Sequence, residues 1–255
     1  MLSFKSLGSG SSGNATLVEA SGLWPCRVLV DCGLGLRTLT QRLAMAGLGA
    51  QDLDAIFITH EHGDHVGCAP ALASRHGLPI WMSEGTWRGC GQPELGDLLH
   101  ITADGDRIDF GAMELRPFAV PHDALEPLQL RCSDGQRSLG VLTDLGHAPA
   151  SVLHQLQGCH ALLLECNHDA DMLSQSAYPH FLKRRVGGEV GHLSNAQSAG
   201  IAEQLKPSLR RVLAGHLSRQ NNRPELAESA LRQVLGDGVE IAVADALTGS
   251  GWLRV

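Results

Sequence analysis

The stretch Thr59-His60-Glu61-His62-Gly63-Asp64-His65 decides the fold of this sequence, because it gathers three imidazoles and two carboxylates within seven residues. Imidazole nitrogen and carboxylate oxygen are the ligands that suit zinc, manganese and iron. The stretch follows an apolar run at 55–58, and if that strand continues for a step, its first two histidines point to one side. The glycine then allows a turn that brings the last Asp-His pair toward a second point. The alternatives are a loop that supplies ligands to two metal ions and a chance cluster.

Length and composition place the chain among ordinary globular proteins. Its 255 residues suffice for one large α/β domain or two small ones, and no linker or charge block divides them, so we expect one domain over 1–255. With 43% hydrophobic and 18% charged residues, the composition is typical of a packed core rather than of a disordered chain. The net charge of −7 excludes binding of nucleic acid through the overall charge of the protein, but it does not exclude a local basic cleft.

Three features favour a cytoplasmic protein without a membrane partner. Residues 1–6 lack the apolar segment of a signal peptide, and no run reaches the roughly 18 apolar residues that cross a bilayer. The seven cysteines are scattered, odd in number and form no CxxC pair, which is typical of reduced thiols rather than of disulfides or a structural zinc site. The sequence leaves the oligomeric state open, with a homodimer as one alternative.

Short apolar runs separated by turns predict an α/β protein in which two sheets pack together with helices outside. Strands are expected at 4–7, 16–20, 27–31, 55–59, 78–82, 107–110, 114–120, 128–132, 138–143, 161–165, 211–214, 240–244 and 252–255. Helices are expected at 36–46, 194–205 and 224–235. Ser194 and Gln197 form a potential capping box for the second helix, and Pro224 suits the first turn of the third.

Polar residues follow three further apolar strands at their carboxyl ends, where the sites of α/β proteins usually form. Each residue alone is an ordinary strand-end residue, but together with the loop at 59–65 they indicate a binuclear metal centre. The expected ligands are His60, His62 and His122 for one ion, Asp64, His65 and His216 for the other, and Asp144 as the bridge between them. Two ions about 3.5–4 Å apart can hold a hydroxide between them and lower the pKa of the parent water, so no separate strong base is needed.

This series of ligands resembles that of the metallo-β-lactamase-fold hydrolases over nearly the whole chain. The resemblance implies a four-layer αββα sandwich of two mixed sheets, and a hydrolase with two divalent ions, either zinc or manganese, with iron also suited to the donors. Asp31 resembles an early aspartate of that superfamily that orients the metal loop through hydrogen bonds, although an aspartate before Gly33 is also a common turn former. The aspartate at position 144 sets the chain apart from the zinc β-lactamases with a cysteine ligand.

Several other segments resemble one branch, the YycJ (WalJ)-type group of bacterial proteins, and more distantly ribonuclease Z and ribonuclease J. They are 8–14, 165–169, 178–179, 183–185, 191–195 and 216–222. Members of the group are described as metal-dependent DNA exonucleases acting from the 5′ end. The resemblance therefore implies a phosphodiesterase that uses a metal-bridging hydroxide, DNA rather than RNA as its partner, and a role in DNA repair. The chain is too short for the inserted domain of ribonuclease J-type enzymes.

The resemblance also implies roles for residues that do not bind metal. His192 corresponds to a histidine that serves phosphodiester cleavage in the ribonuclease Z branch, where a protonated imidazole donates to the leaving oxygen. Its alternative is an ordinary histidine at the start of a helix. Glu165 and His168 are expected to pair and to hold His192 or a ligand in its tautomer, with a plain strand-end hydrogen bond as the alternative. Asp64 joins these three as a catalytic candidate.

Three polar segments are candidates for substrate contact, and each has a simpler alternative. A Gly/Ser loop offers N–H groups to phosphate but lacks the Walker lysine, and a flexible turn explains it equally well. A basic run could contact the DNA backbone or be a solvated face, and two asparagines could bind phosphate or, more safely for one of them, cap the helix at 224. The candidates are Ser11, Ser12 and Asn14 in the loop, Lys183, Arg184 and Arg185 in the run, and Ser218, Asn221 and Asn222 in the segment 216–222. Few aromatic residues are present, so stacking platforms for bases are not evident.

Two other functions compete with the nuclease. A hydrolase of small thioesters or lactones, like hydroxyacylglutathione hydrolase, shares the metal ligands, but thioester cleavage requires neither His192 nor the basic run at 183–185. A metal-binding regulatory or scaffold protein is disfavoured, because all seven ligands are present.

Overall fold

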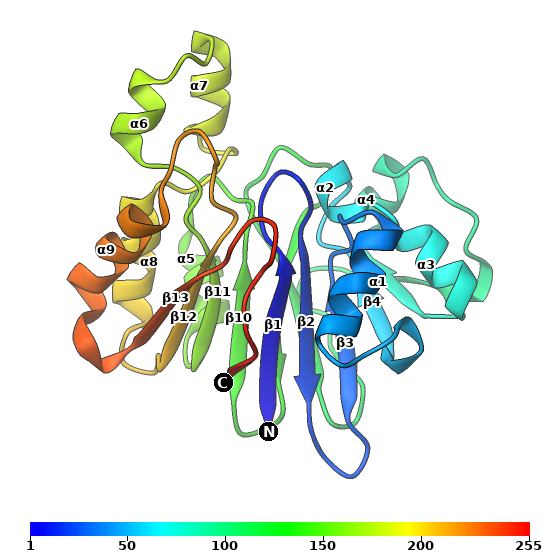
Figure 1. Cartoon of the computed structure of the whole chain (residues 1–255). Coiled ribbons are helices and arrows are strands. Elements are labelled where there is room, and N and C mark those ends of the chain that lie inside the picture. Colours follow the sequence, from blue (N-terminus) through cyan, green and yellow to red (C-terminus); the bar gives the residue numbers. More distant parts are fainter.

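Two seven-stranded sheets face each other in the computed structural model, which describes residues 1–255 (Figure 1). The first sheet runs in the order β14 (Leu253–Arg254), β1 (Leu2–Gly8), β2 (Ala15–Ala20), β3 (Cys26–Val30), β4 (Ala55–Phe57), β5 (Ile80–Met82) and β6 (Leu99–Ile101). The second runs β13 (Glu240–Val243), β12 (Arg211–Gly215), β11 (Ala161–Glu165), β10 (Ser138–Leu142), β9 (Leu128–Ser133), β8 (Glu114–Ala119) and β7 (Ile108–Asp109). Both sheets are mixed: β3 to β6 and β10 to β13 are parallel, and the remaining pairs are antiparallel.

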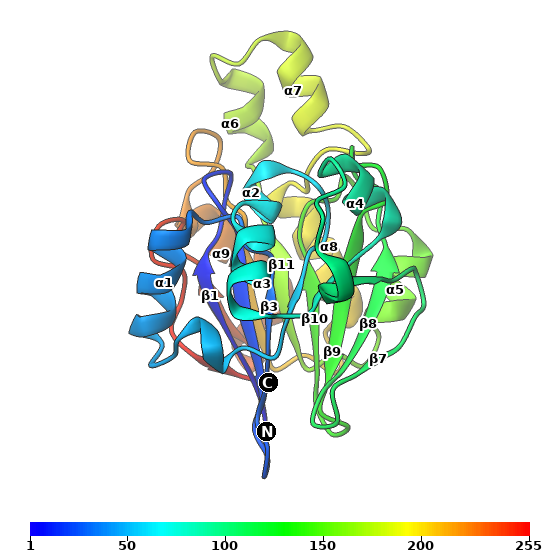
Figure 2. The same ribbon diagram turned by 90° about the vertical axis from the view of Figure 1, so that its right-hand side faces the viewer.

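Helices cover the outer faces of both sheets, as Figures 1 and 2 show. On the first sheet lie α1 (Leu36–Met45) and α3 (Ala69–His76), and on the second lie α5 (Ala150–Leu156), α8 (Asn195–Leu205) and α9 (Pro224–Leu235). A short α4 (Glu84–Gly89) and 3₁₀ turns at Ala50–Asp52, Gly96–Leu98 and Gly236–Gly238 complete the covering segments. The predicted four-layer sandwich is therefore confirmed.

Alternation along the strands explains why their apolar runs are continuous. In β3, Val28 and Val30 point into the core between the two sheets, whereas Leu29 packs beneath the helices of the first sheet. In β4, Phe57 and Ile56 divide between the same two cores. Because successive side chains of a strand point to opposite faces, a sheet covered on both sides needs apolar residues at nearly every position. None of the helices is both long and apolar enough to cross a membrane.

The predicted helix ends are partly confirmed. The capping box of α8 is present: Ser194 Oγ accepts from the Gln197 N–H, and the Gln197 side chain accepts from the Ser194 N–H. The prediction that an asparagine caps α9 is wrong, because the residue at the cap position is Arg223, without a side-chain bond. Asn222 instead exchanges two hydrogen bonds with Asn195 of α8, both of 2.9 Å.

Strand β6 and helices α2 to α7 were not predicted, and of these α2, α6 and α7 lie around the upper edge of the sandwich. Strand β4 ends at Phe57, two residues earlier than predicted, and the following loop contains a one-turn helix, α2 (Gly63–Val66). Between β11 and α8, two helices, α6 (Ala170–Gln175) and α7 (His180–Val186), rise above the sheets (Figures 1 and 2). The basic run is thus part of a helix that stands over this edge.

Candidate metal centre

The carboxyl ends of strands from both sheets meet at this upper edge and carry the predicted ligands. The metal loop (residues 59–65) follows β4, and Asp31, His122, Asp144 and His216 follow β3, β8, β10 and β12. Three of these residues have left-handed backbones, with φ of 62° at Asp31, 53° at Asp144 and 56° at His216. Non-glycine residues hold this conformation only where their surroundings impose it, and such residues concentrate at functional sites.

The first cluster consists of the imidazoles of His60, His62 and His122. Nδ1 of His62 lies 3.0 Å from Nε2 of His60 and 3.3 Å from Nε2 of His122. Ligand nitrogens bound to one zinc ion at roughly 2.0–2.1 Å must stand about 3 Å apart, so these separations suit a single ion. Burial lowers the pKa of His60 and of His122, which favours the neutral imidazole that metals bind.

The second cluster consists of Asp64, His65 and His216. Oδ2 of Asp64 lies 3.8 Å from Nε2 of each histidine. Burial alone would lower the pKa of His216, but Asp144 and the other nearby carboxylates raise it to about 10. The protein alone therefore holds a proton in a place where a divalent cation would compensate the same negative charge.

Asp144 lies between the two clusters and is almost fully buried. Its Oδ2 is 3.1 Å from Nε2 of His65, and its Oδ1 is 3.9 Å from Nε2 of His122. Both Asp144 Oδ2 and His216 Nε2 lack a hydrogen-bond partner, although an unpaired buried polar group costs about 1–3 kcal/mol. Divalent cations would satisfy both atoms, so this donor set fits divalent metal binding.

Two buried carboxylates hold the histidines of the second cluster from behind. Nδ1 of His65 donates to Asp31 over 2.8 Å, and the same carboxylate accepts the Thr59 N–H over 2.9 Å. Nδ1 of His216 donates to Glu165 Oε1 over 2.7 Å. In each case the bond leaves Nε2 turned toward the cluster, which is how outer carboxylates orient metal-binding histidines. The arrangement agrees with the expectation for Asp31.

Close backbone packing fixes the metal loop against the segment after β3. A Cβ on Gly33 would lie 1.7 Å from the carbonyl oxygen of Asp64, so only glycine fits there. Asn14 supports the loop from the other side, because its Nδ2 donates to the same carbonyl over 3.3 Å and its Oδ1 accepts the Gly10 N–H. Asn14 is buried and therefore lies behind the metal loop rather than at a substrate surface.

Glu165 also holds His192, and this corrects the predicted pairing. Nδ1 of His192 donates to Glu165 Oε1 over 3.0 Å, whereas His168 makes no bond to Glu165 and its buried Nδ1 has no partner. Burial acts to raise the pKa of Glu165, but His192 and His216 beside it lower that pKa to about 2. The carboxylate therefore stays charged between the two imidazoles, and the predicted Glu165–His168 pair does not form.

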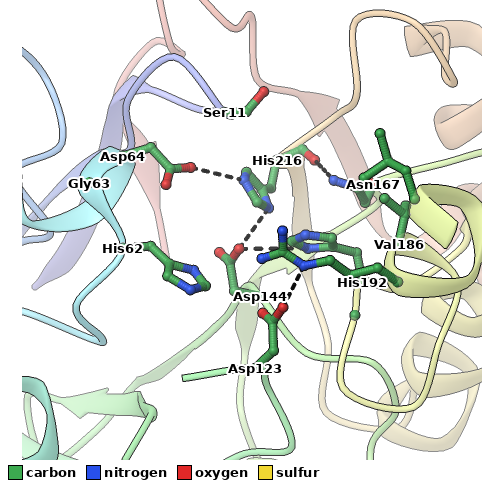
Figure 3. A pocket seen from close by; sticks show the side chains of 13 residues that line it. Ser11, His62, Gly63, Asp64, Asp123, Asp144, Asn167, Val186, His192 and His216 are labelled. Atoms are coloured by element: carbon green, nitrogen blue, oxygen red, sulfur yellow. Dashed lines mark hydrogen bonds and ion pairs between the residues drawn. The ribbon is translucent and has the colours of Figure 1, made fainter. Parts of the chain in front are cut away.

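An open cavity of about 390 Å³, here called the main cavity, lies above the clusters. Figure 3 shows Asp64, Asp144, His192 and His216 turned toward a common space. Arg185 of α7 enters the same cavity, and its Nε lies 2.7 Å from Asp123.

A match to a family model identifies the relatives of the chain. The model of the beta-lactamase superfamily domain matches residues 26–217, which include every residue of both clusters. The chain belongs to the metallo-β-lactamase superfamily. Exodeoxyribonuclease YycJ of Bacillus anthracis is 34% identical over 239 residues, 92% of this chain and 89% of that protein. A ribonuclease Z of Bradyrhizobium sp. (strain ORS 278) is 36% identical over 124 residues, which cover 42% of this chain and 39% of that protein.

Solved structures of the metallo-β-lactamase fold show the same architecture. The crystal structure of YhfI from Bacillus subtilis superimposes with a TM-score of 0.76 at 18% identity, over 99% of this chain and 98% of that one. The predicted resemblance, the fold and the class of metal-dependent hydrolase are therefore confirmed.

The predicted substrate residues of this metallo-β-lactamase-fold hydrolase divide into those near the main cavity and those away from it. Ser11 and Arg185 line the cavity. Lys183 instead donates to the carbonyl of Ser174, and Arg184 is exposed on α7 outside the cavity lining. Ser12 accepts a hydrogen bond from Arg219.

The remaining predicted residues belong to the segment 216–222. Asn222 is held in its pair with Asn195, whereas Ser218 and Asn221 line a smaller neighbouring cavity.

Sequence reasoning missed two polar residues of the main cavity. Asp123 pairs with Arg185, and its only sequence signal was its position directly after His122. Asn167 donates from Nδ2 to the carbonyl of His216 over 3.0 Å and so supports the backbone of that predicted ligand. It falls within the segment 165–169, but no spacing rule singles it out.

Proposed function

We propose that this protein is a two-metal phosphodiesterase that removes nucleotides from the 5′ end of DNA. The observation that carries the proposal is His192, a histidine outside both clusters that a buried carboxylate holds at the wall of the main cavity. A thioester hydrolase needs no such group, because its leaving group departs as a thiolate rather than as a strongly basic alkoxide. The extended likeness to Exodeoxyribonuclease YycJ supports DNA as the substrate.

The residues of the two clusters would hold the metals, with Asp144 shared between them. When bound, the ions supply a nucleophile at neutral pH and neutralise charge on the phosphate. Nitrogen and oxygen donors of this kind accept zinc, manganese or iron, and metal availability often decides among them.

His192 is positioned to hold a proton near the leaving oxygen. Its Nδ1 is engaged by Glu165, so Nε2 is the nitrogen that remains for the substrate. Proton donation to a departing 3′ oxygen contributes typically 10²–10⁴-fold in enzymes, which makes this residue a large part of the expected rate. Glu165 acts through His192 and His216 and is a positioning residue.

Arg185 supplies positive charge to a cavity that otherwise contains mostly carboxylates and imidazoles. Its guanidinium pairs with Asp123 over 2.7 Å, and a phosphate entering the cavity offers it a second anionic partner. Guanidinium groups bind phosphate oxygens through several N–H donors at once. We therefore assign Arg185 to the phosphate next to the cleaved bond.

Purified protein with Mn²⁺ or Zn²⁺ is expected to shorten linear 5′-phosphorylated DNA from the 5′ end and to leave circular single-stranded DNA intact. Product ladders from 3′-labelled oligonucleotides measure this, with RNA of the same sequence and chelator-treated protein alongside. Brisk hydrolysis of a glutathione thioester together with intact DNA and RNA would show that the small-molecule alternative is correct.

The variant Arg185→Ala is expected to raise the KM for DNA and to weaken its salt dependence. Loss of one phosphate contact on single-stranded DNA should reduce the slope of log affinity against log salt by about 0.7. Titrations between low and moderate salt measure the slope. Arg75→Ala, which removes an exposed arginine of α3, is the matched control and should keep the original slope. An unchanged slope in Arg185→Ala would place this residue away from the DNA.

A further inference from the structure

A second cavity of about 150 Å³, here called the side cavity, adjoins the main cavity on its His192 side. The two share a wall, and Figure 3 labels Ser11, Asn167, Val186 and His192 among the shared residues. His192 therefore borders both cavities, and a substrate held at His192 lies next to the side cavity.

The lining of the side cavity is unsuited to phosphate. It contains no lysine or arginine, and its own wall beyond the shared residues includes Tyr178 and Leu217. Tyr178 is the single tyrosine of the chain and comes from the segment between α6 and α7. Its only cationic side chain is His192, on the wall shared with the main cavity, and a wall that is otherwise aromatic, aliphatic or polar without charge suits a flat, uncharged group such as a nucleobase.

Asn221 provides the polar recognition in this cavity. The residue is 1% exposed, yet both its Nδ2 and its Oδ1 lack a hydrogen-bond partner. Its backbone is fixed, because its N–H donates to Ser218 Oγ and its carbonyl accepts the Asp169 N–H over 2.8 Å. The neighbouring amide of Asn222 is paired with Asn195, so of these two asparagines only Asn221 has an unpaired amide.

The buried, unpaired carboxamide of Asn221 places one donor beside one acceptor, which is the pattern that reads the edge of a base. We propose that the side cavity binds the base of the 5′-terminal nucleotide, with Asn221 bonded to its edge and Tyr178 in contact with its surface. The leaving oxygen that His192 serves belongs to this terminal nucleoside, so the nucleoside lies on the His192 side of the cleaved bond. The inference rests on the proposed function and adds a base-binding subsite to it.

The subsite is tested with 5′-phosphorylated oligonucleotides that are identical except for an abasic residue at the first or the second position. For the native protein, an abasic first position should lower kcat/KM by at least about tenfold, and an abasic second position by less. In Asn221→Ala the advantage of the base-bearing end should shrink below about threefold, and Asn221→Asp, which loses the donor, should shrink it too. Gln220→Ala removes an exposed neighbouring amide outside the cavity and should keep the full advantage.

Binding of deoxyadenosine, which carries no phosphate, separates failure of the subsite from failure of the nuclease proposal. Titration calorimetry should show binding to the native protein and at least about tenfold weaker binding to Asn221→Ala. Three results would overturn the subsite. The native protein could cleave abasic and base-bearing ends at equal rates, or only an abasic second position could lower the rate. The third is that Asn221→Ala keeps the full preference for the base-bearing end. If no DNA is cleaved, the nuclease proposal fails, and deoxyadenosine binding alone then decides: equal or absent binding in both proteins overturns the subsite.

Discussion

Asp144→Ala is expected to abolish hydrolysis and to remove most of the bound metal. Asp144 lies between the two clusters, with one oxygen 3.1 Å from His65 and the other 3.9 Å from His122, so its loss affects both ions. Residues that merely support metal ligands cost roughly 10–100-fold in metal affinity or activity, and the loss here should exceed that range. Elemental analysis of dialysed protein and the rate of DNA shortening measure the two effects.

Two further variants serve as controls for the Asp144 experiment. Asp144→Asn keeps the volume of the side chain and removes its charge, so it should lose metal while retaining the fold, as judged by circular dichroism. Asp237→Asn, an exposed aspartate near the end of α9, should retain full metal content and activity. Full occupancy of both ions in Asp144→Ala would contradict the assignment of a shared ligand.

His192→Ala is expected to retain both metals and to lower kcat for DNA by about 10²–10⁴-fold, with a smaller change in KM. The loss should be much smaller for bis(p-nitrophenyl) phosphate, because p-nitrophenolate leaves readily without receiving a proton. This contrast between substrates distinguishes proton donation from a structural role. Measurements of kcat on both substrates, together with metal content, provide the test.

His76→Ala, an exposed histidine at the end of α3, is the matched control and should change neither quantity. A fall in metal content for His192→Ala would instead identify His192 as a ligand, since its Nδ1 lies only 3.6 Å from Asp144. An equal loss on both phosphate esters would contradict proton donation to the leaving oxygen.

The clustering of the predicted donors could be foreseen because its signals are local. The metal loop concentrates its donors within one turn, and His122, Asp144 and His216 each follow an apolar strand that the sequence pattern reveals. Once the strands are parallel within a mixed sheet, their carboxyl ends share an edge and the donors meet. Every strand except the short β6 was predicted, whereas of the helices only α1, α8 and α9 were.

The partners of the supporting residues were not predictable in the same way. Glu165 was expected to pair with His168, three residues away, but it bonds His192, which is 27 residues distant, and His216, which is 51 residues distant. Asn14 supports Asp64 across 50 residues, and Arg185 meets Asp123 across 62. No periodicity links such pairs, because their distance depends on how whole elements pack.

The sequence by itself determined the sandwich, the hydrolase class and the donors of the metal loop, since these depend on residue type, strand alternation and short spacing. Only the tertiary structure decided which polar groups line the two cavities. It turned Asn14 and Asn222 inward, placed Arg185 alone of the basic run in the main cavity, and left the buried amide of Asn221 without a partner beside the side cavity. The physical reason is that a donor's role depends on whether a neighbouring element already satisfies it, and those neighbours come from distant parts of the chain.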